Sequence, residues 1–291
     1  MTVVALVPTY NGARFLTDTL ASLAAQDYPA LRVLVSDDGS SDETWDICEA
    51  FRKRDGRFTA VRQPARLGWI GNSNWLLARA DGDYAFFAPH DDLFEPSYVS
   101  RMVVALAQRP DAVLAFAHTL NFEPDGSRTT RTAEQTVRPG GRVRRGLRYL
   151  GEGDTDRWTP FRGVVRAAAL QDVGGLRPSW SGEIDADGRW LFRLHLLGPF
   201  VRVPEVLCRK RRHPDSLHKS WARPKRTLVA RRAAYAREVL AADLAVRERV
   251  ALLAAVGVAS ALLCLPDRAR AWADRWIRVA AEPAVRLADL G

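Results

Sequence analysis

The chain has 291 residues, of which 47% are hydrophobic and 26% charged, so it can bury a large core and is neither a disordered nor a fibrous protein. Its three cysteines (Cys48, Cys208 and Cys264) are too few and too far apart for a disulfide framework or a thiolate zinc site, which favours a reducing compartment. The formal net charge is +9, but residues 1–100 carry 9 basic and 14 acidic side chains, whereas residues 101–291 carry 34 and 20.

Short apolar runs alternate with stretches of helical periodicity throughout residues 1–117. The first apolar run, residues 3–7, is interpreted as a strand and not as an export signal. This alternation predicts a mostly parallel α/β sheet with helices on both faces. Ser40 and Glu43 have the spacing of a capping box, and Pro96 suits the first turn of a helix. The predicted strands are residues 3–7, 31–35, 58–61, 84–87 and 113–117, and the predicted helices are residues 13–26, 42–53, 72–80 and 97–108.

Residues 118–220 form a second predicted part. Residues 121–158 lack periodicity, and seven arginines lie between positions 126 and 148 against the single acid Glu134, so we expect a basic, loop-rich insertion there. Helical periodicity returns at residues 166–173 and 187–197 and ends each time at glycine. Residues 201–203 and 205–207 are expected to form short strands.

The third predicted part, residues 221–291, is rich in alanine, leucine and arginine and predicts an appendage of two to four helices. Residues 250–265 carry no charge, but this run is shorter than the roughly 20 residues that span a bilayer. A buried helix and a helix lying in a membrane interface are both compatible with it. Arginine makes up 39 of the 43 basic residues, which suits anionic surfaces, although a GC-rich genome produces the same bias.

Two pairs of adjacent aspartates follow predicted strands. Asp37 and Asp38 end the second strand, where a carboxylate can accept hydrogen bonds from a base or a ribose, although a turn and a helix cap would also place them there. Asp91 and Asp92 follow the apolar fourth strand, where two acids need solvent, a partner or a cation, and one of them suits the N-cap of the next helix. Both pairs are candidate ligand-binding residues.

A third group of acids precedes the predicted helix at residues 187–197. Glu183, Asp185 and Asp187 occupy alternate positions there. A carboxylate in a site can act as general base towards a hydroxyl, and acids are also favoured at any helix start for electrostatic reasons. Both interpretations stay open on the residues alone.

In this order and at these distances, the segments resemble the family 2 glycosyltransferases of the GT-A fold. The resemblance implies a Rossmann-like sheet with a nucleotide-sugar-binding half at residues 1–117 and an acceptor-side half at residues 118–220, followed by the helical region at residues 221–291. It is carried by VVALVPTYN at residues 3–11, SDDGSSD at 36–42, Asn74, ADGDY at 80–84, Asp91-Asp92, Pro96, Gly163, VGGL at 173–176, DGRWLFR at 187–193 and RRH at 211–213.

The resemblance also implies roles for individual residues on the donor side. Asp38 would contact the ribose, and Arg66 the base or a phosphate. Asn74, His90, Asp91 and Arg211 belong to the same nucleotide-sugar-binding set. The base would be held by Pro8, Thr9, Tyr10 and Asp37.

Asp91 matches the last aspartate of the family's metal motif, so the resemblance implies that Asp91 and His213 bind Mn²⁺ or Mg²⁺. Pro89 and His90 stand at the motif's first two positions, which departs from the common form. Asp187 matches the catalytic base, with Ala186 in the place of a frequent glutamate. A base and a metal ligand without a nucleophile imply direct displacement with inversion at the anomeric carbon.

Three tryptophans of the acceptor-side half are candidate acceptor-binding residues. An indole at Trp158, Trp180 or Trp190 could stack on a sugar or an aglycone, and core packing is the alternative for each.

We therefore expect a cytoplasmic, inverting, metal-dependent glycosyltransferase. It would transfer a hexosyl or related sugar from a UDP, GDP or dTDP sugar to a hydroxyl of a saccharide, a lipid-linked saccharide or a natural product, in polysaccharide or glycoconjugate biosynthesis. The basic segments predict peripheral contact with the anionic inner face of the cell membrane. A monomer and a homodimer are both compatible with the sequence.

The sequence also bears on three other functions, which are those of an oxidoreductase, a nucleic-acid-binding protein and a catalytically degenerate scaffold. A dinucleotide-dependent oxidoreductase would carry a G-x-G-x-x-G turn after the first strand, where this chain has Pro-Thr-Tyr-Asn-Gly. The basic residues show no signature of a nucleic-acid-binding module, so no nucleic acid partner is expected. A catalytically degenerate GT-A scaffold that binds nucleotides stays an alternative because of Pro89 and Ala186.

Overall fold

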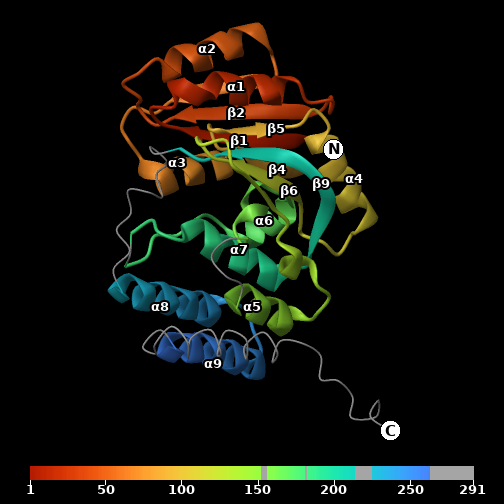
Figure 1. Ribbon diagram of the computed structural model, residues 1–291, viewed down its shortest axis with the longest axis vertical. Helices are drawn as coiled ribbons and strands as arrows, with labels where there is room; N and C mark the ends of the chain where they lie inside the picture. Colours follow the sequence, from red (N-terminus) through yellow and green to blue (C-terminus); the bar gives the residue numbers. More distant parts are fainter. Residues whose placement is uncertain (152–155, 181, 214–224, 263–291) are drawn as a thin grey trace.

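The computed structural model describes residues 1–151, 156–180, 182–213 and 225–262 (Figure 1). Within these residues a nine-stranded sheet has the order β3-β2-β1-β4-β8-β6-β9-β5, with β7 paired to β6 outside this path. The strands are β1 (Val3–Thr9), β2 (Leu31–Asp37), β3 (Phe58–Arg62), β4 (Tyr84–Phe87), β5 (Asp92–Phe94), β6 (Leu114–Phe122), β7 (Arg128–Arg131), β8 (Val164–Arg166) and β9 (Phe200–Arg211).

The first part of the sheet is parallel and confirms the predicted alternation. β3, β2, β1 and β4 pair in parallel, and β1 is buried on both faces. Because side chains alternate along a strand, Val3, Ala5 and Val7 pack on one face, and Val4 and Leu6 on the other. The helices that follow these strands are α1 (Ala13–Ala24), α2 (Thr44–Arg54), α3 (Gly68–Leu77) and α4 (Tyr98–Gln108).

The second part of the sheet is mixed. β8 lies antiparallel between β4 and β6, whereas β9 runs parallel to β6 and antiparallel to β5. The two short strands predicted at residues 201–203 and 205–207 are one strand, β9. The predicted boundary between residues 117 and 118 falls inside β6, so one sheet runs through both halves.

Two local predictions are wrong. The capping box does not form, because the Ser40 amide donates to Asp37 and α2 starts after Glu43 without a side-chain cap. The arginine-rich insertion is not mainly loop, since it contains β7, the 3₁₀ turn η1 (Glu134–Val137) and the helix α5 (Arg142–Gly151). In α5 the residues Gly146, Tyr149 and Leu150 are buried, Arg144 is exposed, and Arg145 donates to the His195 carbonyl of α7 at 2.8 Å.

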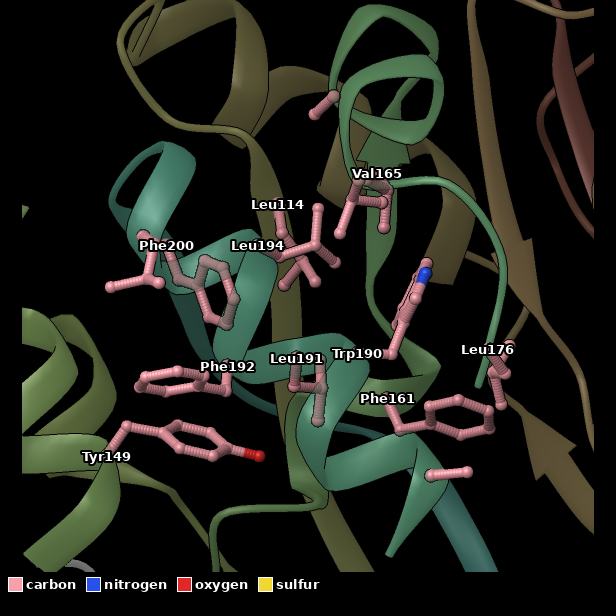
Figure 2. Close-up of a cluster of buried hydrophobic side chains, with 14 of the residues drawn as sticks. Leu114, Tyr149, Phe161, Val165, Leu176, Trp190, Leu191, Phe192, Leu194 and Phe200 are labelled. Atoms are coloured by element: carbon pink, nitrogen blue, oxygen red, sulfur yellow. The ribbon is translucent and has the colours of Figure 1, made fainter. Parts of the chain in front are cut away.

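In Figure 1, α6 (Ala167–Val173) and α7 (Ala186–Leu197) lie below the middle of the sheet. α5 and α8 (Lys225–Ala241) form the next layer and α9 (Val246–Leu262) the outermost. Figure 2 shows the core around α7, where Trp190 lies beside Phe161 and Phe192 faces Tyr149. The predicted helical appendage is therefore packed onto the acceptor-side half.

α9 has a buried side and an exposed side. Leu252 and Val256 are buried, while Val246 and Val250 are exposed. Across the described residues, we find no helix whose length and apolar character would allow it to cross a bilayer. The part of the apolar run beyond residue 262 lies outside the described residues.

Candidate active site

The carboxyl ends of β1 and β2 lie side by side. Thr9, the last residue of β1, is opposite Asp37, the last residue of β2, and the Asp38 amide donates to the Thr9 carbonyl at 2.9 Å. The predicted donor residues at positions 8–10 and 37–38 are therefore brought to one edge of the sheet, where α/β proteins bind ligands.

Asp37 is fully buried at this edge. One carboxylate oxygen accepts hydrogen bonds from the Ser40 amide at 3.2 Å and from the Ser40 hydroxyl. The other oxygen lies 3.5 Å from Nε of Arg62 and accepts no hydrogen bond from the residues that the structure describes. Because a buried acceptor without a hydrogen bond is costly, this oxygen is suited to receive an N–H of a bound base.

Asp38 connects the strand ends to the start of α3. Its two carboxylate oxygens accept hydrogen bonds from the amides of Leu67 at 2.6 Å and Gly68 at 2.9 Å. Burial raises the pKa of Asp38, although the two amides oppose that shift. The same turn carries Arg66, whose guanidinium lies 4.0 Å from the centre of the Tyr10 ring. Asp38 thus holds the segment that places Arg66 beside Tyr10.

Asp91 and His213, the predicted metal ligands, are in contact. Oδ2 of Asp91 lies 3.1 Å from Nε2 of His213. Burial by itself raises the pKa of Asp91, but the charges of His90, Lys210 and Arg162 and the contact with His213 outweigh it and lower that pKa. The Asp91 side chain keeps 19% of its surface exposed, so it is open to a ligand.

His90 and Arg211, which lie near this pair, contact other parts of the protein. Nδ1 of His90 is 3.4 Å from the Pro8 carbonyl, so His90 rests against the predicted base-binding strand. Arg211 forms an ion pair with Asp18 at 2.6 Å and lies over the ring of Phe15, which in turn packs on His213.

Asp92 has a structural role, which is the paired alternative among those that the sequence left open. It is fully buried and forms an ion pair with Arg162, while burial raises its pKa. The prediction that one of the two acids caps the next helix is wrong, because Ser97 is the N-cap residue of α4. Only Asp91 of this pair is available to a cation.

Asp187 and Asp185 lie at the start of α7. Asp187 is half-buried and accepts a hydrogen bond from the Gly188 amide at 2.8 Å. Burial and the neighbouring charge of Asp185 raise the pKa of Asp187, which moves it towards the range of a useful general base. Asp185 is buried and bonds Trp158, Arg157 and Arg231 at 3.2–3.3 Å.

Two contacts link the three groups of acids, which are Asp37 and Asp38, the Asp91–His213 pair, and the acids at the start of α7. Oε1 of Glu183 accepts from the Ile70 amide at 3.1 Å, two residues beyond the Gly68 amide that Asp38 binds. His90, the residue before Asp91, lies 3.4 Å from the Pro8 carbonyl at the end of β1. The nucleotide edge, the Asp91–His213 pair and the start of α7 therefore surround a common region.

Two predicted ligand contacts are not supported by the structure. Trp190 is 1% exposed and donates to the Gly174 carbonyl, so its assignment as an acceptor-binding residue is wrong and it belongs to the core. Both polar atoms of the Asn74 amide bind the Leu176 backbone, at 2.7 and 2.9 Å, which ties α3 to the segment before α7. Trp158 is half-buried beside Asp185, whereas Trp180 is 77% exposed.

Several residues of this region were not found from the sequence. Lys210, Arg162 and Arg157 lie next to the predicted acids, yet each belongs to a segment that the sequence pattern described only as basic or irregular. Arg157 pairs with Asp185, 28 positions away, and Arg162 with Asp92, 70 positions away, so no local signal could pair them.

A comparison with family models decides the family. The model described as "Glycosyl transferase family 2" matches residues 4–171. The chain belongs to this family. Its match covers the strand-end carboxylates at positions 37, 38 and 91 and ends before Asp187.

Relatives of this glycosyltransferase family match shorter stretches. The chain is 27% identical over 123 residues to the glycosyltransferase GlyG of Streptococcus pneumoniae, which is 42% of this chain and 40% of the relative. The chain spans between 36% and 40% of the length of the first curated relatives that it matches.

Solved structures extend the similarity to most of the chain. S. aureus TarS in complex with UDP-GlcNAc is 20% identical and has a TM-score of 0.69 over 89% of this chain and 72% of that chain. A mannosyltransferase from Pyrobaculum calidifontis in complex with GDP-Man and Mn²⁺ is 17% identical, with a TM-score of 0.54 over 96% and 80%. These similarities show the GT-A fold.

The donor set at Asp91 and His213 is compatible with a divalent ion. No group of three or more histidine, cysteine or acidic side chains is placed to hold a metal among the residues that the structure describes. Mg²⁺ and Mn²⁺ nevertheless bind at sites with one or two protein ligands, because phosphate oxygens and water fill the other positions. Asp91 and His213 supply a carboxylate oxygen and an imidazole nitrogen in contact, which fits such a site.

Proposed function

We propose that this protein transfers a sugar from a nucleotide-diphospho-sugar to a hydroxyl acceptor, with inversion at the anomeric carbon. The observation that carries the proposal is the Asp91–His213 pair beside the carboxyl ends of the parallel strands, with the segment before Asp187 held against the start of α3 by Glu183. Family membership supports the reaction class, and the UDP-GlcNAc and GDP-Man named for two structural neighbours support a nucleotide sugar as donor.

In this proposal the donor lies across the strand ends. Oδ2 of Asp37, which forms an ion pair with Arg62 but accepts no hydrogen bond from the described residues, accepts a base N–H, and Thr9 and Tyr10 line the base beside Arg66. Asp91 and His213 hold Mn²⁺ or Mg²⁺, which neutralises charge on the diphosphate when it is bound. The nucleotide is UDP, GDP or dTDP.

Asp187 acts as the general base. It takes the proton of the acceptor hydroxyl while the acceptor oxygen forms its bond to the anomeric carbon. The bond from that carbon to the β-phosphate oxygen breaks, and the electron pair leaves with the nucleoside diphosphate. A single displacement with no enzyme nucleophile inverts the anomeric centre.

We further propose that the acceptor is a saccharide, a lipid-linked saccharide or a natural product bound near the start of α7, next to Trp158 and Trp180. Residues 101–291 carry 34 basic and 20 acidic side chains, among them Arg142, Arg144 and Arg148 of α5. This charge supports peripheral contact with the anionic inner face of a membrane in the cytoplasm.

Binding measurements with a panel of nucleotides test the proposal. UDP, GDP, dTDP and their sugar conjugates would be titrated by calorimetry with Mn²⁺, with Mg²⁺ and with EDTA. We expect the nucleotides of one base to bind with micromolar dissociation constants. The metal should lower the dissociation constants of the diphosphates but not those of the nucleosides. Absence of binding to every nucleotide of the panel would refute the proposal.

The degenerate scaffold is the second candidate, favoured by Pro89, which supplies no carboxylate at the metal pair. It predicts nucleotide binding without turnover. A donor hydrolysis and transfer assay with a panel of hydroxyl acceptors separates the two, because only an enzyme releases the nucleoside diphosphate from its sugar conjugate.

A further inference from the structure

A cavity of about 140 Å³ lies between the segment before α7 and the helix α8. The charged residues that line it are Arg177 of that segment, Arg189 of α7, and Arg237 and Glu238 of α8. In Figure 1, α8 lies on the side of α7 that is away from the sheet, and Arg189 is turned by about 200° around α7 from Asp187. The cavity is therefore separate from the strand ends where the nucleotide is proposed to bind.

Positive charge exceeds negative charge around this cavity. Glu238 is the one acid among the described residues that line it, and it forms ion pairs with Arg177 at 3.0 Å and Arg189 at 3.3 Å. It also pairs with the neighbouring Arg193 at 3.4 Å. Arg237 is exposed and has no hydrogen bond or ion pair with the residues that the structure describes. Four guanidinium groups and one carboxylate leave three positive charges without a counter-charge.

Two features of the buried arginines show that Glu238 alone does not satisfy them. Arg189 is 3% exposed, and its Nε makes no hydrogen bond with any residue of the described ranges. Burial and the charges of Arg177 and Arg189 lower the pKa of Arg193 to about 10, although the charge of Glu238 opposes that shift. Because a buried N–H without an acceptor is costly, an anion in the cavity would stabilise this cluster of arginines.

The side chains around the cavity suit a phosphate group. A guanidinium presents its N–H groups in a planar fork that matches two phosphate oxygens, and the cavity has room for a group of several heavy atoms. Trp180 lines the same cavity and is 77% exposed, so its indole offers an apolar surface on which a sugar ring can stack. These residues fit a phosphate that is either free or attached to a saccharide.

We propose that this cavity binds a phosphate group, as the free ion or as part of a phosphorylated saccharide. The inference goes beyond the proposed function and does not depend on it. Arg177, Arg189 and Arg237 donate hydrogen bonds to the phosphate oxygens, while Glu238 holds the buried guanidinium groups in place. Because the ligand contacts both α8 and the segment before α7, its binding stabilises the docking of α8.

Calorimetry at constant ionic strength tests this site, with inorganic phosphate, glucose 1-phosphate and glucose as the ligands. The variant is Arg237→Met, which removes an exposed side chain that no described residue holds in place. The matched control is Arg247→Met, which deletes the same charge from an exposed position of α9 that does not line the cavity. All titrations contain EDTA, so that no metal recruits phosphate to the Asp91–His213 pair.

We expect both phosphate ligands to bind the wild-type protein and glucose not to bind. Arg237→Met should weaken both phosphates by about tenfold, the usual effect of losing a hydrogen bond between charged groups, and Arg247→Met by less than about twofold. Trp180→Ala distinguishes the two sources of phosphate. Weaker binding of glucose 1-phosphate with unchanged binding of inorganic phosphate supports a phosphorylated saccharide, and no change for either ligand supports the free ion.

The proposal is overturned if neither phosphate binds, if glucose binds as tightly as glucose 1-phosphate, or if Arg237→Met and Arg247→Met weaken the phosphates equally. Phosphate that binds elsewhere, for example at the nucleotide end, would not respond to Arg237→Met, and this result also overturns it. If Arg237→Met does not fold, Arg237→Gln and Arg177→Met are compared with Arg247→Met in the same way. None of these outcomes depends on nucleotide binding, so a failure of this site and a failure of the proposed function are separate results.

Discussion

The two ends of the site hold their carboxylates by different means. At the nucleotide end, Asp38 is held by the backbone amides of Leu67 and Gly68. At the acceptor end, Asp185 is held by the side chains of Arg157, Trp158 and Arg231, which come from the segment before η2 (Thr159–Arg162) and from α8. Backbone amides are present whatever the side chains are, whereas the second arrangement exists only when α8 is docked.

The same contrast extends to the next layer of the acceptor end. Glu238 of α8 is buried and forms ion pairs with Arg177, Arg189 and Arg193 at 3.0–3.4 Å. Two of these arginines belong to α7, the helix that carries Asp187. The acceptor end therefore depends on charged side chains between helices that are distant in sequence, and substitutions should affect it more strongly than the nucleotide end.

The largest effect is expected for Asp187, the proposed base. Asp187→Asn keeps the shape of the side chain but removes its proton acceptor, so the turnover rate should fall by about 10² to 10⁴. Nucleotide binding should stay within about twofold, because Asp187 belongs to the acceptor end. Steady-state kinetics and calorimetry measure both. Asp172→Asn, an exposed acid of α6, is the control, and a parallel loss of binding and turnover in Asp187→Asn would contradict the role.

The second effect concerns stability at the acceptor end. Glu238→Gln leaves three guanidinium groups without their buried carboxylate, which should lower the free energy of unfolding by about 3–5 kcal/mol. Glu134→Gln removes an exposed ion pair with Arg202 and should cost less than about 1 kcal/mol. Urea denaturation compares them. Equal values for the two variants would show that the buried Glu238 cluster stabilises the protein no more than an exposed ion pair does.

The third prediction concerns acid stability. Burial lowers the pKa of His195 to about 3, and its ring packs against Phe200 and Tyr149. Since the unfolded chain has an ordinary histidine pKa near 6.5, it binds a proton that the folded chain excludes. This contribution is fully present above pH 6.5 and is lost as the pH falls towards 3, by about 1.4 kcal/mol per pH unit.

Urea denaturation between pH 7 and 4 checks this prediction against a variant without the ionisable group. His195→Leu should be less sensitive to acid over that range, whatever its stability at pH 7. Identical slopes of unfolding free energy against pH in the two proteins would show that His195 does not cause the loss of stability between pH 7 and 4.

The smallest effect is expected at the nucleotide end. A Cβ on Gly12 would lie 2.7 Å from Oγ1 of Thr9 and 2.9 Å from the His90 ring, so Gly12→Ala must displace one of them. We expect a loss of about 1–3 kcal/mol in stability and weaker nucleotide binding. Gly56→Ala meets no atom within 4 Å and should change stability by less than about 0.5 kcal/mol. Thermal unfolding and calorimetry of both variants make the comparison.

Much of the nucleotide end followed from local patterns. The apolar runs at residues 3–7 and 84–87 predicted two strands, and β1 and β4 confirm them. The acids that directly follow residues 31–35 and 84–87 predicted the edge of the sheet where these strands end. The capping box does not form because the Ser40 amide donates to the buried Asp37 and not to Glu43, and the Ser40 hydroxyl oxygen accepts from the Asn11 amide at 2.9 Å. Asn11 is 29 positions away, so local spacing could not indicate this contact.

The acceptor end was less accessible to such reasoning. The arginine-rich insertion looked irregular, yet Gly146 packs under Leu252 of α9, and this tertiary contact supports α5 as a helix. Trp190 could have faced a ligand or the core, and only the packing against Phe161 and Phe87 decides for the core.

The sequence by itself determined the order of strands and helices and the positions of the acids at strand and helix ends, because both depend on periodicity within a few residues. Only the tertiary structure decided which acids are already paired, as Asp92 is with Arg162, and which stay open to a ligand, as Asp91 does. The physical reason is that ion pairs in this protein join segments up to 193 positions apart, and their partners are chosen by the docking of helices and strands and not by neighbours along the chain.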